Sequence, residues 1–205
     1  MSSQRNSRFR AGATAVALAA SALGAAAPAQ AAPAGNHPIE CRGHGVDPNA
    51  LIRAEAEAVI DAPLRTIWAL QTDVERWPTW QAGVLTMDRL DPGPLRKGSR
   101  FRWTTPAPPT PTTPETVLEV TSTVQDAKHQ SCLRWTGPAV GEGLRIDEGV
   151  HVWTFTKVAG GVRVRTQETW TGAQVEADVP TATALLDGGL EQWMGELKAL
   201  AEARA

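Results

Sequence analysis

Apolar and polar residues alternate at the start of the folded part of the chain. In "LIRAEAEAVI" every second residue is apolar and shares one face: Ile52, Ala54, Ala56, Ala58 and Ile60. A repeat of two is typical of a strand with one buried face. Residues 51–60 are therefore predicted to form the first strand.

Two short helices are predicted directly after this strand. Asp61 and Pro63 are suited to a helix start, and the first helix would run from about Leu64 to Leu70. Asp73 would cap a second short helix, which Pro78 would end.

A series of strands is predicted between residues 84 and 170. The segments are about 84–90, "SRFRW" at 99–103, "TVLEVTSTV" at 116–124, "SCLRWTG" at 131–137, and two strands within "HVWTFTKVAGGVRVRTQETW" at 151–170. The segment "TTPAPPTPTTPE" at 104–115 is predicted to be an extended exposed loop, because proline removes a backbone donor and fixes φ.

After Pro180 the apolar repeat lengthens to that of a helix. One stripe is formed by Leu186, Leu190, Trp193, Leu197 and Leu200. The pattern predicts a long amphipathic C-terminal helix whose weak point is the pair Gly188-Gly189. Together the elements predict an α+β fold, in which an antiparallel sheet of about seven strands covers this helix.

The first residues do not fit this domain. Arg5, Arg8 and Arg10 precede the uncharged run "AGATAVALAASALGAAA", and Ala29-Gln30-Ala31 has the small-x-small cleavage pattern. We interpret residues 1–31 as a cleaved secretory signal peptide, so that the protein would be secreted or extracytoplasmic. A retained membrane anchor is less favoured, because the run is short and rich in alanine.

The remaining chain is divided into an N-terminal tail at 32–50 and one domain at 51–205, as its length allows. The signal carries three of the 20 Lys and Arg residues and none of the 22 Asp and Glu residues. Its removal leaves 17 bases and 22 acids, a net charge of −5. A net-acidic domain without a basic stripe argues against nucleic acid as a partner.

Two cysteines, Cys41 and Cys132, remain in the exported chain. An even count in an oxidising compartment predicts a disulfide between them, and two unpaired thiols are the alternative. His37, Cys41 and His44 offer three possible metal ligands without a fourth, so we expect no metal site and no cofactor.

A hairpin with its turn at 159–161 places His151 directly opposite Glu168. Opposed side chains have Cβ atoms roughly 4.5–5.5 Å apart, within reach of a hydrogen bond. Three interpretations stay open for such a pair among tryptophans. The two side chains could satisfy each other structurally, orient a bound ligand, or act as an acid and a base.

The segment "IDAPLRTIWALQTDVERWPTWQAGV" resembles the entry segment of the SRPBCC superfamily, the START-like and polyketide-cyclase/dehydrase-like proteins. "LRWTG", "HVWTF", "GGVRVRTQETWTG" and "GLEQWMGELKALAEA" are similar to its later strands and closing helix. The resemblance covers about residues 51–204. It implies a helix-grip fold, with a curved antiparallel sheet around the C-terminal helix and an apolar cavity between them. The proline-rich insertion at 104–114 departs from the family pattern and would border the cavity mouth.

The inward faces of these strands supply the candidate site. The ligand-binding candidates are Phe101, Trp103, Trp135, His151, Trp153, Thr166, Glu168 and Trp170. Four other tryptophans are expected to pack in the core: Trp68, Trp77, Trp80 and Trp193. The small side chains of Ala54, Ala56 and Ala58 would leave room for a ligand.

We therefore expect a protein that binds a small hydrophobic or amphipathic molecule in an aromatic-lined cavity. The alternative is a polyketide-cyclase/dehydrase-like enzyme that uses His151 and Glu168 as catalytic acid and base. A module that binds another protein has less support, because no separate apolar surface patch can be identified. Superfamily resemblance does not choose between carriers and catalysts.

Overall fold

The computed structural model describes residues 38–205. The predicted signal peptide at 1–31, the first part of the predicted tail and His37 lie outside the described residues.

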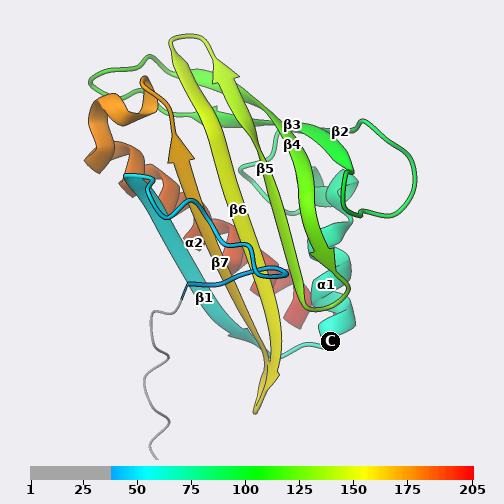
Figure 1. Cartoon of the computed structure of the whole chain (residues 1–205). Coiled ribbons are helices and arrows are strands. Elements are labelled where there is room, and N and C mark those ends of the chain that lie inside the picture. The colour runs from blue at the N-terminus through cyan, green and yellow to red at the C-terminus, as the bar shows by residue number, and fades with distance from the viewer. Residues whose placement is uncertain (1–37) are drawn as a thin grey trace, which may run out of the picture. The chain divides into compact units, whose positions relative to one another are not determined.

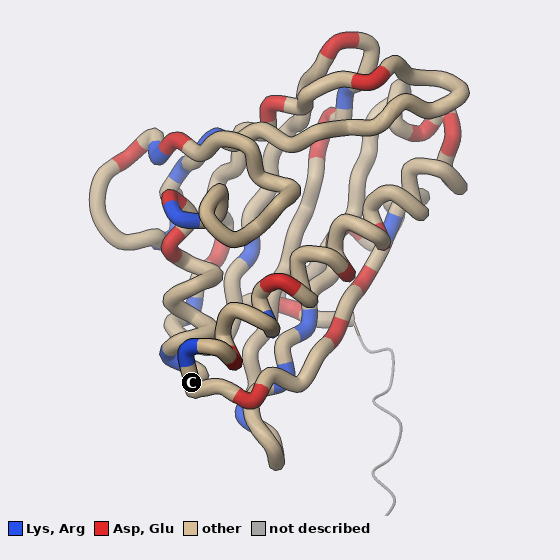
Figure 2. The backbone as a smooth tube through the Cα atoms, turned by 180° about the vertical axis from the view of Figure 1, so that it is seen from behind, with Lys and Arg blue, Asp and Glu red and all other residues tan. Residues whose placement is uncertain are grey.

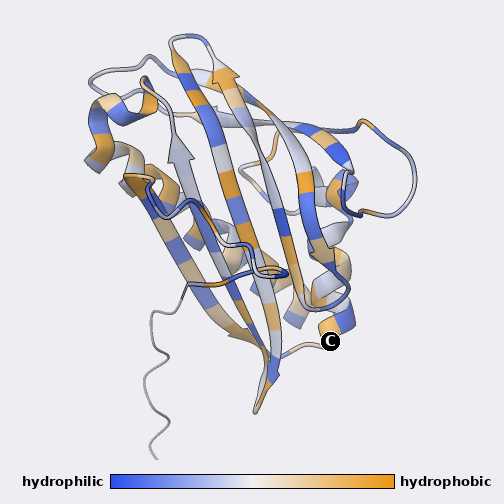
Figure 3. Cartoon of the chain, viewed as in Figure 1, coloured by the Kyte–Doolittle hydropathy of each residue, from blue (hydrophilic) through white to orange (hydrophobic). Residues whose placement is uncertain are grey.

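Seven antiparallel strands form one curved sheet in the order β1-β7-β6-β5-β4-β3-β2 (Figure 1). Their bounds are β1 (Ile52–Ile60), β2 (Thr86–Arg89), β3 (Arg100–Ala107), β4 (Thr116–Lys128), β5 (Cys132–Gly141), β6 (Leu144–Val158) and β7 (Gly161–Thr171). Hydrophilic and hydrophobic residues alternate along β6, as a strand with two different faces requires (Figure 3). The first strand of the chain pairs with the last, and the predicted helix-grip class is confirmed.

The long helix crosses the concave face of the sheet, in front of the strands in Figure 2. The helical segments are α1 (Leu64–Thr72), η1 (Val74–Thr79), η2 (Val175–Asp178) and α2 (Val179–Glu202). Asp178 caps α2 by accepting a hydrogen bond from Thr181 N at 3.2 Å. The predicted stripe of α2 is buried at Leu186, Leu190 and Trp193.

The second short helix starts differently from its prediction. Asp73 directly precedes η1, but its side chain makes no capping hydrogen bond and instead lies 3.5 Å from Arg76 Nε. Pro78 lies inside η1, which ends one residue later at Thr79.

The prediction of a loop throughout 104–115 was wrong for residues 104–107, which belong to β3. Thr104 directs its carbonyl toward β2 and accepts a hydrogen bond from Leu85 N. Pro106 follows two residues later, and its nitrogen points to the same side of β3. The pairing of β2 with β3 extends only as far as Thr104, so β2 does not reach this nitrogen. The missing N–H therefore costs no ladder hydrogen bond, and proline is compatible with this edge position.

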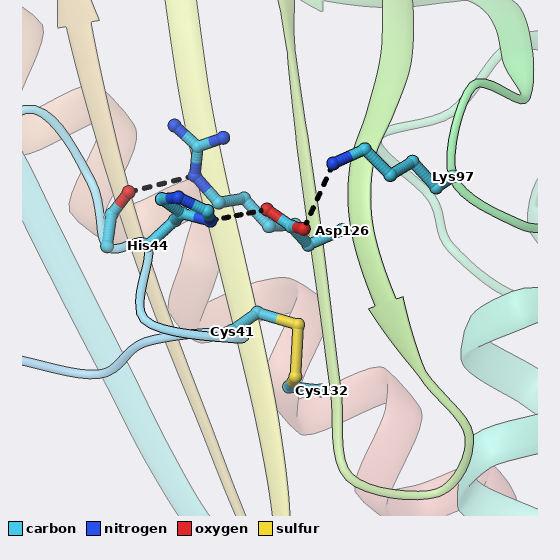
Figure 4. The surroundings of a disulfide bond; sticks show 7 residues. Cys41, His44, Lys97, Asp126 and Cys132 are labelled. Carbon is cyan, nitrogen blue, oxygen red and sulfur yellow. Dashed lines mark hydrogen bonds and ion pairs between the residues drawn. A yellow bond between two sulfur atoms is a disulfide. The ribbon is translucent and has the colours of Figure 1, made fainter.

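An N-terminal strap, residues 38–50, runs over the outer face of the sheet, which carries no helix (Figure 1). Its apolar residues Ile39 and Val46 are buried together with Val150 and Val152 of β6. Cys41 forms a disulfide with Cys132 of β5 (Figure 4). The segment that the sequence indicates only as a tail is thus a packed and covalently linked part of the domain.

Polar contacts hold the strap on both sides of the disulfide. Asp126 is buried, and its carboxylate lies 2.9 Å from His44 Nδ1 and 3.5 Å from Lys97 Nζ (Figure 4). Arg134 Nε donates to the carbonyl oxygen of Gly45 at 2.9 Å. Ile39 N donates to Gln167 Oε1 at 3.2 Å.

Candidate functional site

The hairpin of β6 and β7 has the register that the sequence predicts. Val158 pairs with Gly161, so Trp153 lies opposite Thr166 and His151 lies opposite Glu168. His151 is buried, with 2% of its side chain exposed, and Glu168 has 18% exposed. The imidazole is therefore the inner member of the pair and the carboxylate is the outer member.

Both ring nitrogens of His151 have partners. Nδ1 lies 2.9 Å from Glu168 Oε2, and Nε2 lies 2.6 Å from Thr166 Oγ1. Thr166 Oγ1 also lies 3.2 Å from the carbonyl oxygen of Val152, to which it can only donate. Because a hydroxyl has one hydrogen, Thr166 either donates it to Val152 and accepts from His151 Nε2, or donates it to Nε2, according to the tautomer of the histidine.

One hydrogen lies between His151 Nδ1 and Glu168 Oε2, and either the imidazole or the carboxyl group can supply it. The other carboxyl oxygen, Oε1, accepts from Trp170 Nε1 at 2.8 Å. Since an indole N–H can only donate, Oε1 is an acceptor in both cases.

Indole rings surround the imidazole of His151. Its ring centroid lies 4.6 Å from that of Trp135, 5.3 Å from Trp153 and 5.8 Å from Trp193. These contacts separate His151 from the outside, so any molecule in the site reaches Glu168 first.

A pocket of about 570 Å³ lies between the concave face of the sheet and the N-terminal half of α2. Apolar side chains from β4, β6 and α2 form most of its wall, among them Leu118, Ile146 and Leu186. Glu168 and Trp170 reach it from β7. The proline-rich loop after β3 contributes Thr110, Thr112 and Thr113, which agrees with its expected place beside the cavity.

The pocket is hollow because side chains are missing on both of its sides. Gly137 of β5 and Gly149 of β6 are a cross-strand pair, and both line it. A Cβ at Gly137 would overlap the carbonyl oxygen of Thr121, so close approach of β4 requires glycine there. On the opposite side, Gly188 and Gly189 line the pocket from α2.

The structure brings only part of the predicted ligand-binding set to this pocket. Trp103, Glu168 and Trp170 line it. The other candidates are buried outside its lining: Phe101, Trp135, His151, Trp153 and Thr166. In the core, Phe101 packs edge-on against Trp77, with ring centroids 5.5 Å apart.

Sequence reasoning missed several lining residues. Trp193, expected only in the core, packs against Trp77 with ring centroids 4.8 Å apart and also lines the pocket. Ala54, Ala56 and Ala58, expected to leave room, do not line it and pack within the apolar clusters. The sequence did contain one signal for the α2 side of the pocket, the pair Gly188-Gly189. Two consecutive glycines are unfavourable within a helix, and here both of them line the pocket.

A helix-grip fold around a mostly apolar pocket, whose lining includes the carboxylates of Glu168 and Asp178, is typical of proteins that enclose small molecules. The comparison with families agrees, because residues 52–202 match the family described as polyketide cyclase / dehydrase and lipid transport. The chain belongs to this family, and the resemblance to the SRPBCC superfamily is confirmed. No curated protein matches the sequence.

Solved structures share the fold at low sequence identity. Protein TTHA0849 of Thermus thermophilus is 18% identical with a TM-score of 0.58, and the match covers 75% of this chain and 99% of that one. The hypothetical protein jhp0584 of Helicobacter pylori is 18% identical with a TM-score of 0.54, and the match covers 74% of this chain and 89% of that one. The di-domain ARO/CYC StfQ from the steffimycin biosynthetic pathway is 19% identical with a TM-score of 0.54, and the match covers 73% of this chain and 45% of StfQ.

Within residues 38–205, no helix is long and apolar enough to cross a membrane. The same residues contain no group of three or more His, Cys, Asp or Glu side chains that could hold a metal ion.

Proposed function

We propose that this chain is an exported protein that binds a small hydrophobic or amphipathic molecule in the pocket beneath α2. The observation that carries the proposal is the pocket itself, about 570 Å³ in volume and walled mainly by apolar side chains. Ligand sites typically combine such walls with a few polar groups that fix orientation. Glu168, held by His151 and Trp170, is such a group.

Two features support export. The positive, apolar and small-residue regions within residues 1–31 follow the order of a secretory signal. The Cys41–Cys132 disulfide is of the kind that persists in oxidising compartments.

Binding is tested by titrating the purified domain with the neutral fluorescent probe N-phenyl-1-naphthylamine. We expect saturable enhancement of probe emission, and loss of most of it in Gly189→Leu. Gly189 lies one turn from Trp193 on α2, and no atom lies within 4 Å of the position of a Cβ there. Because Gly189 lines the pocket and a Cβ there lies in open space, we expect a leucine at this position to occupy part of the pocket.

The matched control is Gly195→Leu. Gly195 also lies on α2 with free space around it, but does not line the pocket. Equal probe binding by both variants, with the fold retained by circular dichroism, would show that the probe does not occupy this pocket.

A second function, a cyclase or dehydratase, is favoured by one observation. Glu168 lines the pocket while His151 is hidden behind it and shares a proton with it. This is the arrangement of a carboxyl group that exchanges a proton with a bound molecule and passes it to a second base.

Mass spectrometry of the molecules that copurify with the protein separates the two functions. A dehydratase, or a cyclase that closes its ring with loss of water, predicts that the wild type and Glu168→Gln carry related molecules that differ by one water. A binding protein predicts the same molecule in both. Identical masses, with both proteins folded, would contradict a dehydration catalysed by Glu168.

A further inference from the structure

The pocket lining is unbalanced in charge. It contains two carboxylates, Glu168 and Asp178, and no Lys, Arg or His among the described residues. Burying an unpaired charge in an apolar site is costly. A bound anion would therefore find no counter-charge in the lining, whereas a bound cation or hydrogen-bond donor would find carboxyl oxygens.

The two positively charged groups nearest the pocket that could attract an anion are both blocked. The N-terminus of α2 carries partial positive charge, but the carboxylate of Asp178 already occupies it. His151, when it carries a positive charge, lies behind Glu168 and is only 2% exposed. The carboxylate is therefore closer to the ligand than the imidazolium is.

Glu168 Oε1 is a polar atom that a ligand can use. It accepts from Trp170 Nε1, and a carboxyl oxygen has a second lone pair for another donor. The neighbouring Gly149 leaves this oxygen uncovered, because a Cβ at Gly149 would lie 3.6 Å from it. An incoming N–H or O–H can occupy that space.

We propose, on the basis of the binding function above, that the natural ligand is a neutral or cationic amphiphile that donates an N–H or O–H hydrogen bond to Glu168 Oε1. Fatty acids and phosphate-bearing lipids are then poor ligands. The apolar part of the ligand lies along the walls formed by β4, β6 and α2.

The test is displacement of N-phenyl-1-naphthylamine by four amphiphiles with the same tail. These are dodecylamine as the cation, dodecan-1-ol as the neutral donor, methyl dodecanoate as a neutral molecule without a donor, and dodecanoate as the anion. We expect the amine and the alcohol to bind at least about tenfold more tightly than dodecanoate, a difference of about 1.4 kcal/mol. The affinity of the methyl ester should lie between that of the alcohol and that of dodecanoate.

Two variants assign the selectivity to Glu168. In Glu168→Gln the preference for the amine over dodecanoate should shrink severalfold. In Gly149→Ala the methyl group should cover Oε1 at an ordinary van der Waals distance, so the amine and the alcohol weaken while the methyl ester does not. Glu191→Gln is the control, because it removes an exposed carboxylate that does not line the pocket.

The outcomes distinguish this inference from the function on which it rests. If dodecanoate displaces the probe as well as dodecylamine does, the inference is overturned and the binding function stands. An unchanged preference in Glu168→Gln also overturns it. If the wild type does not bind the probe saturably, the binding function fails and the inference fails with it.

Discussion

Thr166 connects the buried histidine to the backbone of β6 through a single hydroxyl group. It is fully buried, and its Oγ1 lies 2.6 Å from His151 Nε2 and 3.2 Å from the carbonyl oxygen of Val152. Because these groups are shielded from solvent, each depends on the others for its hydrogen bond. A polar chain of this kind is stabilising only when it is complete.

Thr166→Val keeps the shape of the side chain and removes the hydroxyl. His151 Nε2 and the Val152 carbonyl then lose their partner, and we expect the free energy of unfolding to fall by about 1–3 kcal/mol. Urea denaturation measures the change. Thr166→Ser, which restores the hydroxyl, should recover most of it, and equal stability of the valine variant and the wild type would contradict the assigned network.

The sequence predicts the pairing of His151 with Glu168 because parity and turn position are local properties of one hairpin. It does not predict which of the two faces the ligand. That depends on Trp135 from β5 and Trp193 from α2, which pack on the imidazole from distant parts of the chain. Thr166 is likewise identified as inward-facing by parity, but its bond to Val152 is visible only in the structure.

Helix α2 contains three glycines in a segment that otherwise favours a helix. At Gly188 and Gly195 no atom lies within 4 Å of the position of a Cβ, so neither glycine is needed for packing. Each is therefore unfavourable to the helix by up to about 1 kcal/mol relative to alanine. Only Gly188 of these two lines the pocket.

Gly188→Ala and Gly195→Ala should therefore both raise the free energy of unfolding, by up to about 1 kcal/mol each. Thermal or urea unfolding checks the gain. Only Gly188→Ala should also weaken ligand binding, because Gly188 lines the pocket and Gly195 does not. A loss of stability in Gly188→Ala would mean that the space beside the helix is filled rather than open.

The hairpin of β2 and β3 depends on a carboxylate. Asp91 accepts from the backbone N of Arg100 and lies 2.9 Å from Arg89 Nη2. The hydrogen bond from Arg100, followed by that from Arg89, lowers the pKa of Asp91 below its ordinary value of 3.8. A lowered pKa in the folded state means that the charged form stabilises the fold above 3.8 and that this contribution is lost as the pH falls through the folded value.

Asp91→Asn should therefore be less stable than the wild type at neutral pH. The difference should shrink as the pH falls below 3.8 and should disappear below the lowered pKa of the folded state, where the wild-type carboxylate also becomes neutral. Thermal unfolding of both proteins over a pH series measures this. A difference independent of pH would assign the effect to the shape of the loop instead of its charge.

Most elements were predictable because their signals are periodic and local. The alternation in β1 and the apolar stripe in α2 predicted the correct structures. Whether Pro106 lies in a strand or in a loop could not be predicted locally, because it depends on how far the neighbouring strand β2 extends. The position of the pocket was not predictable for a similar reason. It lies where the glycine pair of β5 and β6 faces the glycines of α2, and no single segment contains that information.

On the scale of the whole domain, the disulfide links two segments that are 91 residues apart in the sequence. The strap contributes few apolar side chains, and those few are buried against β6. A cross-link that closes a long loop reduces the entropy of the unfolded chain, which compensates for the small area of apolar contact.

The double variant Cys41→Ser, Cys132→Ser should be less stable than the oxidised wild type by roughly 2–4 kcal/mol. Urea denaturation without reductant measures the difference. Added dithiothreitol should lower the stability of the wild type and leave the variant unchanged. Identical unfolding curves for the two proteins would show that the noncovalent contacts alone hold the strap.

The short length of β2 leaves the outer edge of β3 uncovered beyond Thr104. An uncovered edge is where a second copy of a sheet protein could add a strand, which is a common first step of aggregation. Pro106 offers no N–H to such a strand, and the proline-rich loop begins directly after Ala107. Pro106 thus limits the pairing of a further strand at this edge, and replacing Pro106 by valine would restore an N–H that such a strand could use.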